Sequence, residues 1–234
     1  MGFMDGLLNE ENHPWNAGIT AKDEIVAINY AHDTIESWDS QFEIIVNVVA
    51  DLAPDWQGYM KNWLDNGAGD SIDILAIDHY PDTWTVFTDA RDWGALDSLF
   101  ELCDQYHKKG AIMETGFSTW APEDTKQIQG IPYWHTEDDQ KNYINTALPI
   151  VYNKTFEHNS ASSNKLIMAT WYNLRNPKRL YDRYILPIGF GILAGFDFDA
   201  FEANFGIINT EFKPKLAYPS LVTQINNFYC PRGV

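Results

Sequence analysis

The sequence predicts an α/β protein in which helices cover a parallel sheet. Two observations lead to this prediction. Short apolar runs rich in β-branched residues alternate with amphipathic stretches along much of the 234-residue chain, and polar or aromatic residues follow most of these runs directly. Parallel strands need a crossover connection, usually a helix, and the alternation supplies one after each strand. An open sheet and a barrel both satisfy this pattern.

Five runs are expected to be strands. Residues 42–49 and 72–77 are nearly continuous apolar runs with many Val and Ile residues, which is typical of strands buried on both faces. The other three cover residues 3–8, 111–113 and 166–170. No glycine-rich phosphate loop follows the first run, which weakens the case for a nucleotide-binding open sheet.

Helices are expected between and after these strands. The expected ranges are residues 22–37, 56–66, 95–108, 138–152 and 219–227. Gly67 is a plausible C-cap for the second of them. Pro149 lies within the fourth, where the missing N–H should kink or shorten the helix.

Composition excludes several classes of partner. The formal net charge is −17, which disfavours nucleic acid and anionic membrane surfaces because both attract Lys and Arg. No stretch reaches the ~20 apolar residues of a spanning helix, and the first residues lack the features of a signal peptide. Aromatic residues make up 15% of the chain. Many lie beside Asp, Asn or Gly, as in sugar sites, although an aromatic core would give the same composition.

No metal and no cofactor are expected. Cys103 and Cys230 are the two cysteines, and they lack the spacing of metal ligands. Cys103 falls in an expected helix, so we expect it to be buried rather than reactive. Asn153 begins a glycosylation triplet, which is weak support for secretion.

Functional side chains are expected at the carboxyl ends of the strands, where active sites of parallel α/β proteins collect. Asn9 and Glu10 follow the first strand, and Glu114 follows the fourth. Asp78-His79-Tyr80 follows the third strand, and Trp171 follows the fifth. The second strand has no polar end, and its Asn47 is expected to be structural. Four strand ends of compatible chemistry predict one pocket.

Several of these motifs, in their order and spacing, resemble those of a known enzyme group. Leu7-Leu8-Asn9-Glu10, Ile77-Asp78-His79-Tyr80-Pro81, Ile112-Met113-Glu114-Thr115-Gly116 and the closing Lys213-Pro214-Lys215 are the segments concerned. The chain resembles the C-terminal part of clan A glycoside hydrolases, which are retaining enzymes with an eight-stranded barrel. The resemblance implies a TIM-type (β/α) barrel that is partial, with strands four to eight only. It also implies that residues 1–234 form a single domain lacking the first three strands.

The resemblance also implies a mechanism and a site. Glu10 would be the acid/base and Glu114 the nucleophile of a double displacement on a β-linked poly- or oligosaccharide. Asn9 would hold the 2-hydroxyl, Tyr80 would hydrogen-bond Glu114, and Trp171 would form the floor under the cleaved sugar. The remaining substrate-binding candidates are His79, Trp15, Trp84 and Trp120. An extracellular location is expected on the same ground.

Alternatives remain at several positions. Glu11 could replace Glu10 as the acid, but neighbouring residues of a strand point to opposite faces, so only one of them faces the pocket. His79 could be a structural histidine. Trp15, Trp84, Trp120 and Trp134 could stack on further sugars or could simply pack loops.

Five strands cannot close a barrel that needs eight, and they leave two sheet edges open. The chain is therefore expected to be a fragment, to be completed by self-association or by a chain that supplies the missing N-terminal half, or to cover its edges in a new way. A second functional hypothesis follows, namely a catalytically silent remnant that binds a carbohydrate or another partner.

Overall fold

The computed structural model describes residues 20–51, 55–83, 89–119, 135–176 and 204–229. Residue contacts divide the chain into two units. The first unit comprises Met1–His79, Trp93–Thr115 and Asn153–Thr170. The second unit comprises Tyr80–Asp92, Gly116–Tyr152 and Trp171–Val234. The single barrel-like domain expected over residues 1–234 stays a prediction.

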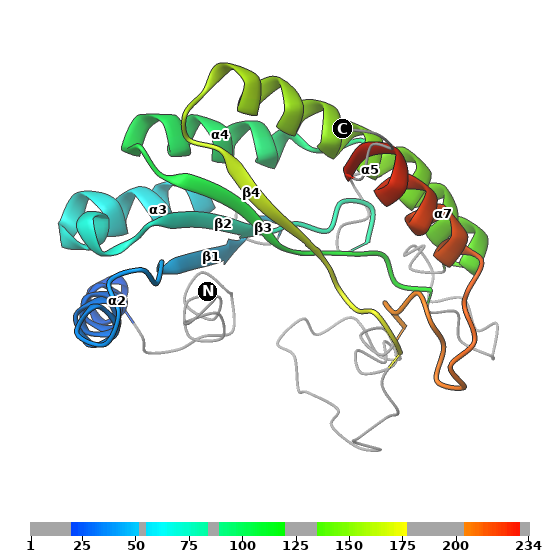
Figure 1. The fold of residues 1–234 in the computed structure, drawn as a ribbon, viewed down its shortest axis with the longest axis horizontal. Helices are drawn as coiled ribbons and strands as arrows, with labels where there is room; N and C mark the ends of the chain where they lie inside the picture. The colour runs from blue at the N-terminus through cyan, green and yellow to red at the C-terminus, as the bar shows by residue number, and fades with distance from the viewer. Residues whose placement is uncertain (1–19, 52–54, 84–88, 120–134, 177–203, 230–234) are drawn as a thin grey trace, which may run out of the picture. The chain divides into compact units, whose positions relative to one another are not determined.

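A four-stranded sheet is the centre of the first unit (Figure 1). Its strands are β1 (Ile45–Val49), β2 (Ile74–Asp78), β3 (Lys109–Thr115) and β4 (Leu166–Trp171), and they lie side by side in chain order. The β1–β2 and β2–β3 pairs are parallel. Four of the five expected strands are thus confirmed, and the one expected at residues 3–8 lies outside the described residues.

The strands form where β-branched and small apolar residues can be buried on both faces of the sheet. Every residue of β2 is buried. On one face Ile45, Ile74, Ala76 and Ala111 pack together, with Met113 against them. These five residues alternate with residues that point the other way, as the two-residue period of a strand requires.

Three helices of the first unit begin and end near the expected residues. They are α2 (Ala21–Glu36), α3 (Trp56–Trp63) and α4 (Gly94–Tyr106). The short helices η1 (Leu64–Ala68) and η2 (Gly69–Ser71) continue α3. Gly67 has a φ of 111°, which only glycine adopts without strain, so the regular helical backbone stops near the expected C-cap.

The α2 and α3 helices are joined by a buried polar contact. The indole Nε1–H of Trp63 donates to Oε2 of Glu24 at 2.6 Å, and both side chains are fully buried. Burial of a carboxylate costs free energy unless the carboxylate is hydrogen-bonded. The hydrogen bond from Trp63 to Glu24 therefore stabilises the packing of α2 against α3. Thr20 and Asp23 cap the start of α2 reciprocally.

Helix α5 (Glu137–Ala161) is longer than expected. The shortening expected at Pro149 is wrong, because the helix continues to Ala161. Its buried residues include Gln140, Tyr143, Ile144, Ala147 and Val151, which follow helical spacing along one face. Burial of this face offsets the hydrogen bond that Pro149 cannot make.

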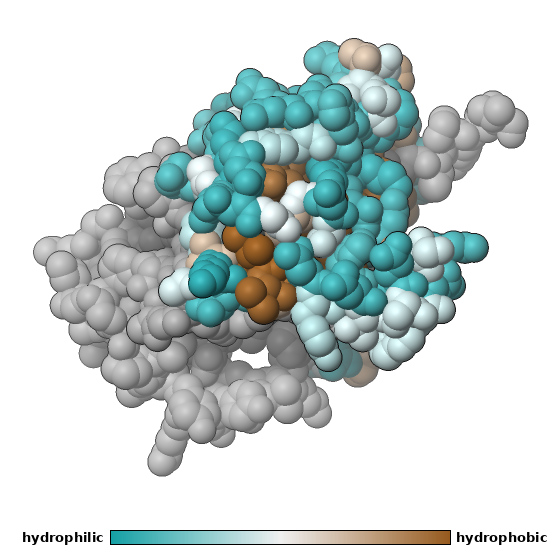
Figure 2. Space-filling view, turned by 90° about the vertical axis from the view of Figure 1, so that its left-hand side faces the viewer, coloured by the Kyte–Doolittle hydropathy of each residue, from teal (hydrophilic) through white to brown (hydrophobic). Residues whose placement is uncertain are grey.

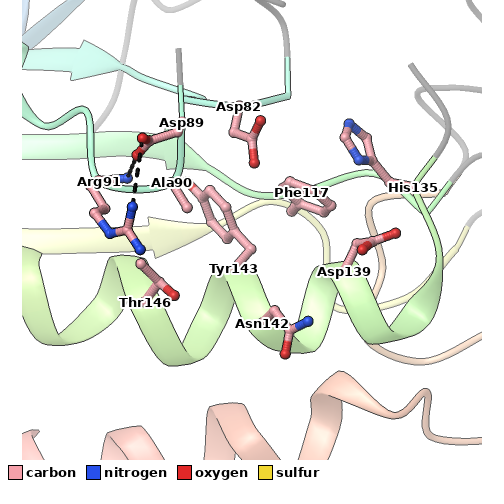
Figure 3. Close-up of a pocket in the computed structure, with 10 residues that line it drawn as sticks. All are labelled: Asp82, Asp89, Ala90, Arg91, Phe117, His135, Asp139, Asn142, Tyr143 and Thr146. Atoms are coloured by element: carbon pink, nitrogen blue, oxygen red, sulfur yellow. Dashed lines mark hydrogen bonds and ion pairs between the residues drawn. The ribbon is translucent and has the colours of Figure 1, made fainter. Parts of the chain in front are cut away.

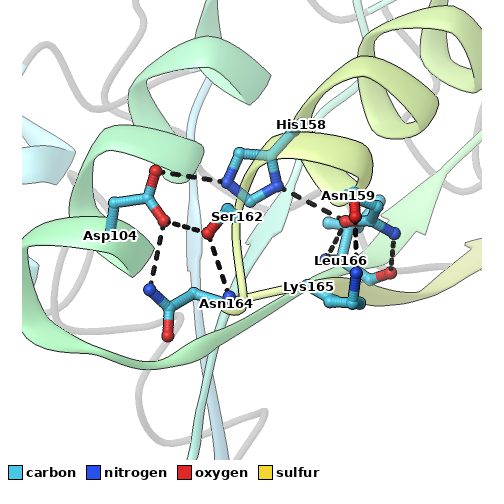
Figure 4. Close-up of polar contacts among 7 residues, drawn as sticks. All are labelled: Asp104, His158, Asn159, Ser162, Asn164, Lys165 and Leu166. Carbon is cyan, nitrogen blue, oxygen red and sulfur yellow. Dashed lines mark hydrogen bonds and ion pairs between the residues drawn. The ribbon is translucent and has the colours of Figure 1, made fainter.

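The C-terminal end of α5 is tied to α4 and β4 by a polar network (Figure 4). Asp104 accepts hydrogen bonds from Ser162 and Asn164, which lower the pKa of its carboxyl. The His158 ring stacks on Phe100 with ring centres 4.0 Å apart. The Asn159 side chain holds Leu166 through both its backbone N–H, at 2.9 Å, and its carbonyl, at 3.0 Å. The start of β4 is therefore held by side chains as well as by the sheet.

The second unit has its own apolar cluster, built from α5 and α7 (Ala217–Gln224), which η3 (Ile225–Tyr229) continues. The helix expected at residues 219–227 is thereby confirmed. Ile144, Ile207, Ala217 and Leu221 form the cluster.

Close packing recurs at Gly116, where a Cβ atom would lie 2.3 Å from the carbonyl oxygen of Tyr172. Glycine is therefore required at this position of the Glu-Thr-Gly motif.

A buried lysine joins three segments of the second unit. Nζ of Lys215 donates to Oγ1 of Thr119 at 2.8 Å, to the carbonyl oxygen of Asn204 at 2.9 Å and to Oδ1 of Asn176 at 3.2 Å. Burial lowers the pKa of Lys215 to about 8, against the opposing effect of Glu137. The three acceptors compensate for the loss of water around the ammonium group.

The described surface is mostly hydrophilic on the face that Figure 2 shows. Hydrophobic residues gather in one central area of this face. No helix among the described residues is long and apolar enough to cross a membrane.

Cys103 is fully buried as expected, and burial raises the pKa of its thiol to about 12.

Candidate functional site

Glu114 lies in β3, one residue before the strand ends, at the carboxyl edge of the sheet. It is the register partner of Asp78 at the end of β2, and the pairing has an irregularity between Ile77 and Asp78. The backbone N–H of His79 donates to the carbonyl oxygen of Glu114 at 3.0 Å. The Glu114 side chain is partly exposed, whereas Asp78 and His79 are buried. The strand end that sequence motifs single out therefore has polar side chains beside it.

A buried amide and carboxylate lie on the strands next to Glu114. Nδ2 of Asn47, in β1, donates to Oδ2 of Asp78 at 2.8 Å, and both side chains are 2% exposed. Asn47 is the register partner of Ala76, two residues before Asp78, so both polar side chains lie on the face that carries Ala76. Asn47 has the structural role that its sequence position suggests, and it holds the Asp78 carboxylate in place.

A buried contact between Asp51 and His79 lies at the same edge of the sheet. Oδ1 of Asp51 is 2.8 Å from Nδ1 of His79, and the side chains are 2% and 6% exposed. Trp93 packs edge-on against the imidazole, with ring centres 5.0 Å apart. Such burial is what the structural alternative for His79 predicts. Its role in substrate binding stays a prediction.

Two other candidates belong to the second unit. Tyr80 is 5% exposed, and its ring meets Tyr172 and Phe205 edge-on with centres 6.3 Å and 5.5 Å apart. Trp171 packs against the apolar cluster of this unit and lies 6.1 Å from the ring of Tyr143. Its Nε1 is buried without a hydrogen-bond partner among the described residues. The sugar contacts expected of Tyr80 and Trp171 stay predictions.

A pocket of about 250 Å³ lies within the second unit (Figure 3). Side chains from one face of α5 point toward the segments around Asp82 and Arg91 and toward Phe117. The residues that line it are Asp82, Asp89, Ala90, Arg91, Phe117, His135, Asp139, Asn142, Tyr143 and Thr146. Phe117 and Tyr143, at 1% and 2% exposed, form an apolar floor, so polar groups supply most of the accessible lining.

Ionisable groups in this pocket are perturbed. Burial raises the pKa of Asp82, and the nearby carboxylates of Asp89 and Asp139 raise it further. Burial lowers the pKa of His135, while Asp139 acts in the opposite direction. The backbone N–H of Arg91 donates to Oδ1 of Asp89 at 2.6 Å. Perturbed groups in a concave pocket are typical of binding sites.

Five predicted site residues lie outside the described residues. They are Asn9, Glu10, Trp15, Trp84 and Trp120. The pairing of Glu10 with Glu114 therefore stays a prediction, as does the choice between Glu10 and Glu11. Within the described part of the chain, no group of three His, Cys, Asp or Glu residues could hold a metal ion.

Sequence reasoning missed three features of these regions. Asp51 falls in a turn after β1, and no motif distinguishes it from the other aspartates. Asp78 stands at a strand end that the sequence marks, but only the polar Asn47 inside an apolar strand indicates that Asp78 has a buried partner. The pocket around Asp82 and Asp139 has no sequence signature, because residues far apart in the chain line it.

Comparison with known proteins bears on the fold. No protein-family model and no curated protein sequence matches this chain. Solved structures do match. A Faecalibacterium prausnitzii β-glucuronidase is similar at 14% identity and a TM-score of 0.56, over 93% of this chain and 30% of that protein.

Two further structures are similar at the same level of identity. A fungal β-1,4-galactanase matches at 14% identity and a TM-score of 0.52, over 90% of this chain and 57% of that protein. The Ignisphaera aggregans GH53 catalytic domain matches at 14% identity and a TM-score of 0.53, over 88% and 54% respectively. The chain thus spans between 30% and 57% of the length of these three structures.

These matches confirm the expected fold class. The similar structures are TIM-barrel glycosidases, and the strand order and parallel pairing of β1, β2 and β3 agree with consecutive strands of such a barrel. At this identity the likeness is one of fold. The chain therefore has the fold of part of a (β/α) barrel, the fold of these glycosidase structures.

Proposed function

We propose that this chain is the catalytic part of a retaining glycoside hydrolase that cleaves β-linked poly- or oligosaccharides. One observation carries the proposal. Glu114 lies partly exposed at the carboxyl edge of a parallel sheet, next to two buried polar pairs, Asn47–Asp78 and Asp51–His79. In barrel enzymes the catalytic groups lie at this edge of the sheet. The fold shared with glycosidases supports the same function.

The proposed reaction is a double displacement. The Glu114 carboxylate attacks the anomeric carbon as Glu10 protonates the leaving oxygen, so the glycosidic bond breaks and a glycosyl ester forms on Glu114. Glu10 then takes a proton from water, which attacks the same carbon and releases the sugar and the free Glu114 carboxylate. Both steps invert the anomeric carbon, so the product keeps the configuration of the substrate.

The buried polar pairs have a supporting role in this proposal. They fix the ends of β1 and β2 next to the strand that carries Glu114, because each pair joins side chains from different segments. A nucleophile works best when its surroundings hold it within a fraction of an ångström of the productive position. Their rigidity therefore favours a catalytic role for Glu114 over that of an ordinary surface glutamate.

Substitution of the nucleophile tests the proposal. Turnover of xylan, galactan and aryl β-glycosides would be measured for the wild-type chain, for Glu114→Gln and for Glu101→Gln. Glu101 is an exposed glutamate of α4 and serves as the control. We expect Glu114→Gln to lose nearly all turnover and Glu101→Gln to keep it. Activity that survives in Glu114→Gln would refute the assignment of Glu114.

Stereochemistry gives a second readout. Proton NMR of the first product released from an aryl β-glycoside should show the β-anomer, because two inversions restore the configuration. Initial release of the α-anomer would contradict double displacement, even if Glu114 proved essential.

The second candidate function is a catalytically silent remnant that binds carbohydrate. The polar pocket of the second unit favours it, because binding of a sugar needs no catalytic pair. A remnant would show no turnover in the wild type, and Glu114→Gln would leave its affinity for sugars unchanged. An extracellular location would suit both functions and stays a prediction.

A further inference from the structure

The pocket of the second unit has the size for one small ligand. Its volume of about 250 Å³ falls just below the ~300 Å³ at which sites for drug-sized molecules begin. The polar lining comes from three directions, namely the segment with Asp82, the segment with Asp89 and Arg91, and the α5 face with Asp139 and Asn142. A ligand there would be surrounded by hydrogen-bonding groups.

The charge of the lining disfavours anions. Three aspartates line the pocket, against one arginine and one histidine, His135, whose pKa is lowered by burial. Arg91 is paired with Asp89, with Nη1 3.8 Å from Oδ2, so its charge is already offset. Burial raises the pKa of Asp82, and the carboxylates of Asp89 and Asp139 raise it further, as a negative potential in the pocket would. A ligand that carries a carboxylate would be repelled by the same potential.

The chemistry of the lining favours hydroxyl groups. Carboxylates accept hydrogen bonds and cannot donate while ionised, so the three aspartates require donors on the ligand. Asn142 and Thr146 can both donate and accept, and the buried rings of Phe117 and Tyr143 close the floor. A small molecule with many hydroxyl groups and no charge satisfies this combination.

We propose that this pocket of the second unit binds one uncharged sugar residue and rejects uronic acids. The choice of a sugar as the hydroxyl-rich ligand rests on the proposed function, whereas the selection against anions rests on the lining alone. The chain would therefore prefer neutral sugars over uronic acids, although its fold is similar to that of a β-glucuronidase.

Direct binding measurements test the proposal. Isothermal titration calorimetry would use the full-length Glu114→Gln chain, so that no ligand is turned over. The probes would be xylobiose and galactobiose as neutral sugars and galacturonic acid as the anion. We expect measurable binding of at least one neutral sugar and at least tenfold weaker binding of galacturonic acid.

Variants show whether the pocket is responsible. Asp82→Asn keeps the shape of the side chain, and asparagine tolerates the positive φ of 63° at this position. Asp82→Asn and Asn142→Ala should each weaken binding of the neutral sugar about tenfold. Asp82→Asn should also reduce the difference in affinity between the neutral sugar and galacturonic acid. Asp138→Asn is the matched control, because Asp138 is an exposed residue of the same helix turn that does not line the pocket.

Each outcome decides the proposal separately from the catalytic one. Neutral-sugar binding that both pocket variants weaken supports the site, even if the wild type shows no turnover. Absence of neutral-sugar binding, equal binding of galacturonic acid, or affinity unchanged in both variants would overturn the site. A wild type that hydrolyses glycans despite such a result would keep the proposed function and lose only this pocket.

Discussion

Oδ1 of Asp51 lies 2.8 Å from Nδ1 of His79, and both side chains are buried at the carboxyl edge of the sheet. The pair joins a turn after β1 to the residue that follows β2. The backbone N–H of that same histidine donates to the carbonyl oxygen of Glu114. A contact between Asp51 and His79 thus stabilises the strand end that presents the proposed nucleophile.

Removal of the charge from Asp51 should destabilise the chain. In Asp51→Asn the buried imidazole of His79 loses the carboxylate that lies 2.8 Å from its Nδ1, and loss of a buried hydrogen-bonding partner costs about 1–3 kcal/mol. The free energy of unfolding, measured by urea titration, should fall by that order. Asp70→Asn, at an exposed position of the same unit, should have little effect. A change below ~0.5 kcal/mol in Asp51→Asn would show that the pair does not contribute.

Lys215 should give the chain a distinct alkaline pH dependence. Its pKa falls from 10.5 to about 8 on folding, chiefly because burial disfavours the charged form. Between these values the unfolded chain binds more protons at this group than the folded chain does, so the contribution of Lys215 to stability rises with pH. Below about pH 8 its contribution is constant.

The Lys215→Met variant isolates this effect, because other titrating groups cancel in the comparison. The free energy of unfolding of the wild type, relative to Lys215→Met, should rise by roughly 2 kcal/mol between pH 8 and pH 10. Urea titrations at several pH values would measure it. Parallel pH curves for the two proteins would show that Lys215 does not titrate in this range.

Gly116→Ala should be strongly destabilising. The added Cβ would lie 2.3 Å from the carbonyl oxygen of Tyr172 and 2.9 Å from the Phe205 ring. A backbone oxygen cannot move aside as the tip of a flexible side chain can, and overpacking of this kind costs about 1–3 kcal/mol or more. Thermal unfolding should therefore begin several degrees lower. An unchanged melting temperature would mean that the chain near Tyr172 adapts freely.

Self-association of the chain, expected from an open sheet edge, can be tested at β4. Among the described residues β4 is an edge of the sheet, and its Ile167 and Met168 are 49% and 39% exposed. Exposed apolar edge strands favour pairing with another chain, and lysine blocks it. Sedimentation velocity should show a dimer or larger species that Ile167→Lys converts to monomer. A monomeric wild type would leave association without support.

Much of the fold could be predicted from local patterns. The strands at β1, β2, β3 and β4 and four of the helices follow from apolar periodicity and turn residues, because burial of regular elements imposes these patterns on the sequence. The length of α5 could not be predicted, because local rules expect a helix to kink or end near a proline such as Pro149. Burial of the α5 face against distant residues offsets its effect.

The site shows the same division. Glu114, His79, Tyr80 and Trp171 could be singled out because strand ends are recognisable in the sequence, although their roles stay predictions. Asp51 could not, because its importance comes from His79, a partner that is distant in the chain. The pocket around Asp82 and Asp139 is likewise a product of long-range contacts.

The sequence by itself determined which segments become strands and helices, that the class is α/β, and that a glutamate follows the strand at residues 111–113. Tertiary structure alone decided which polar groups are buried together, namely Asn47 with Asp78, Asp51 with His79, and Lys215 with its three acceptors. The physical reason is range. Backbone conformation responds to neighbours within a few residues, whereas burial, pairing and pKa depend on groups that only the folded chain brings into contact.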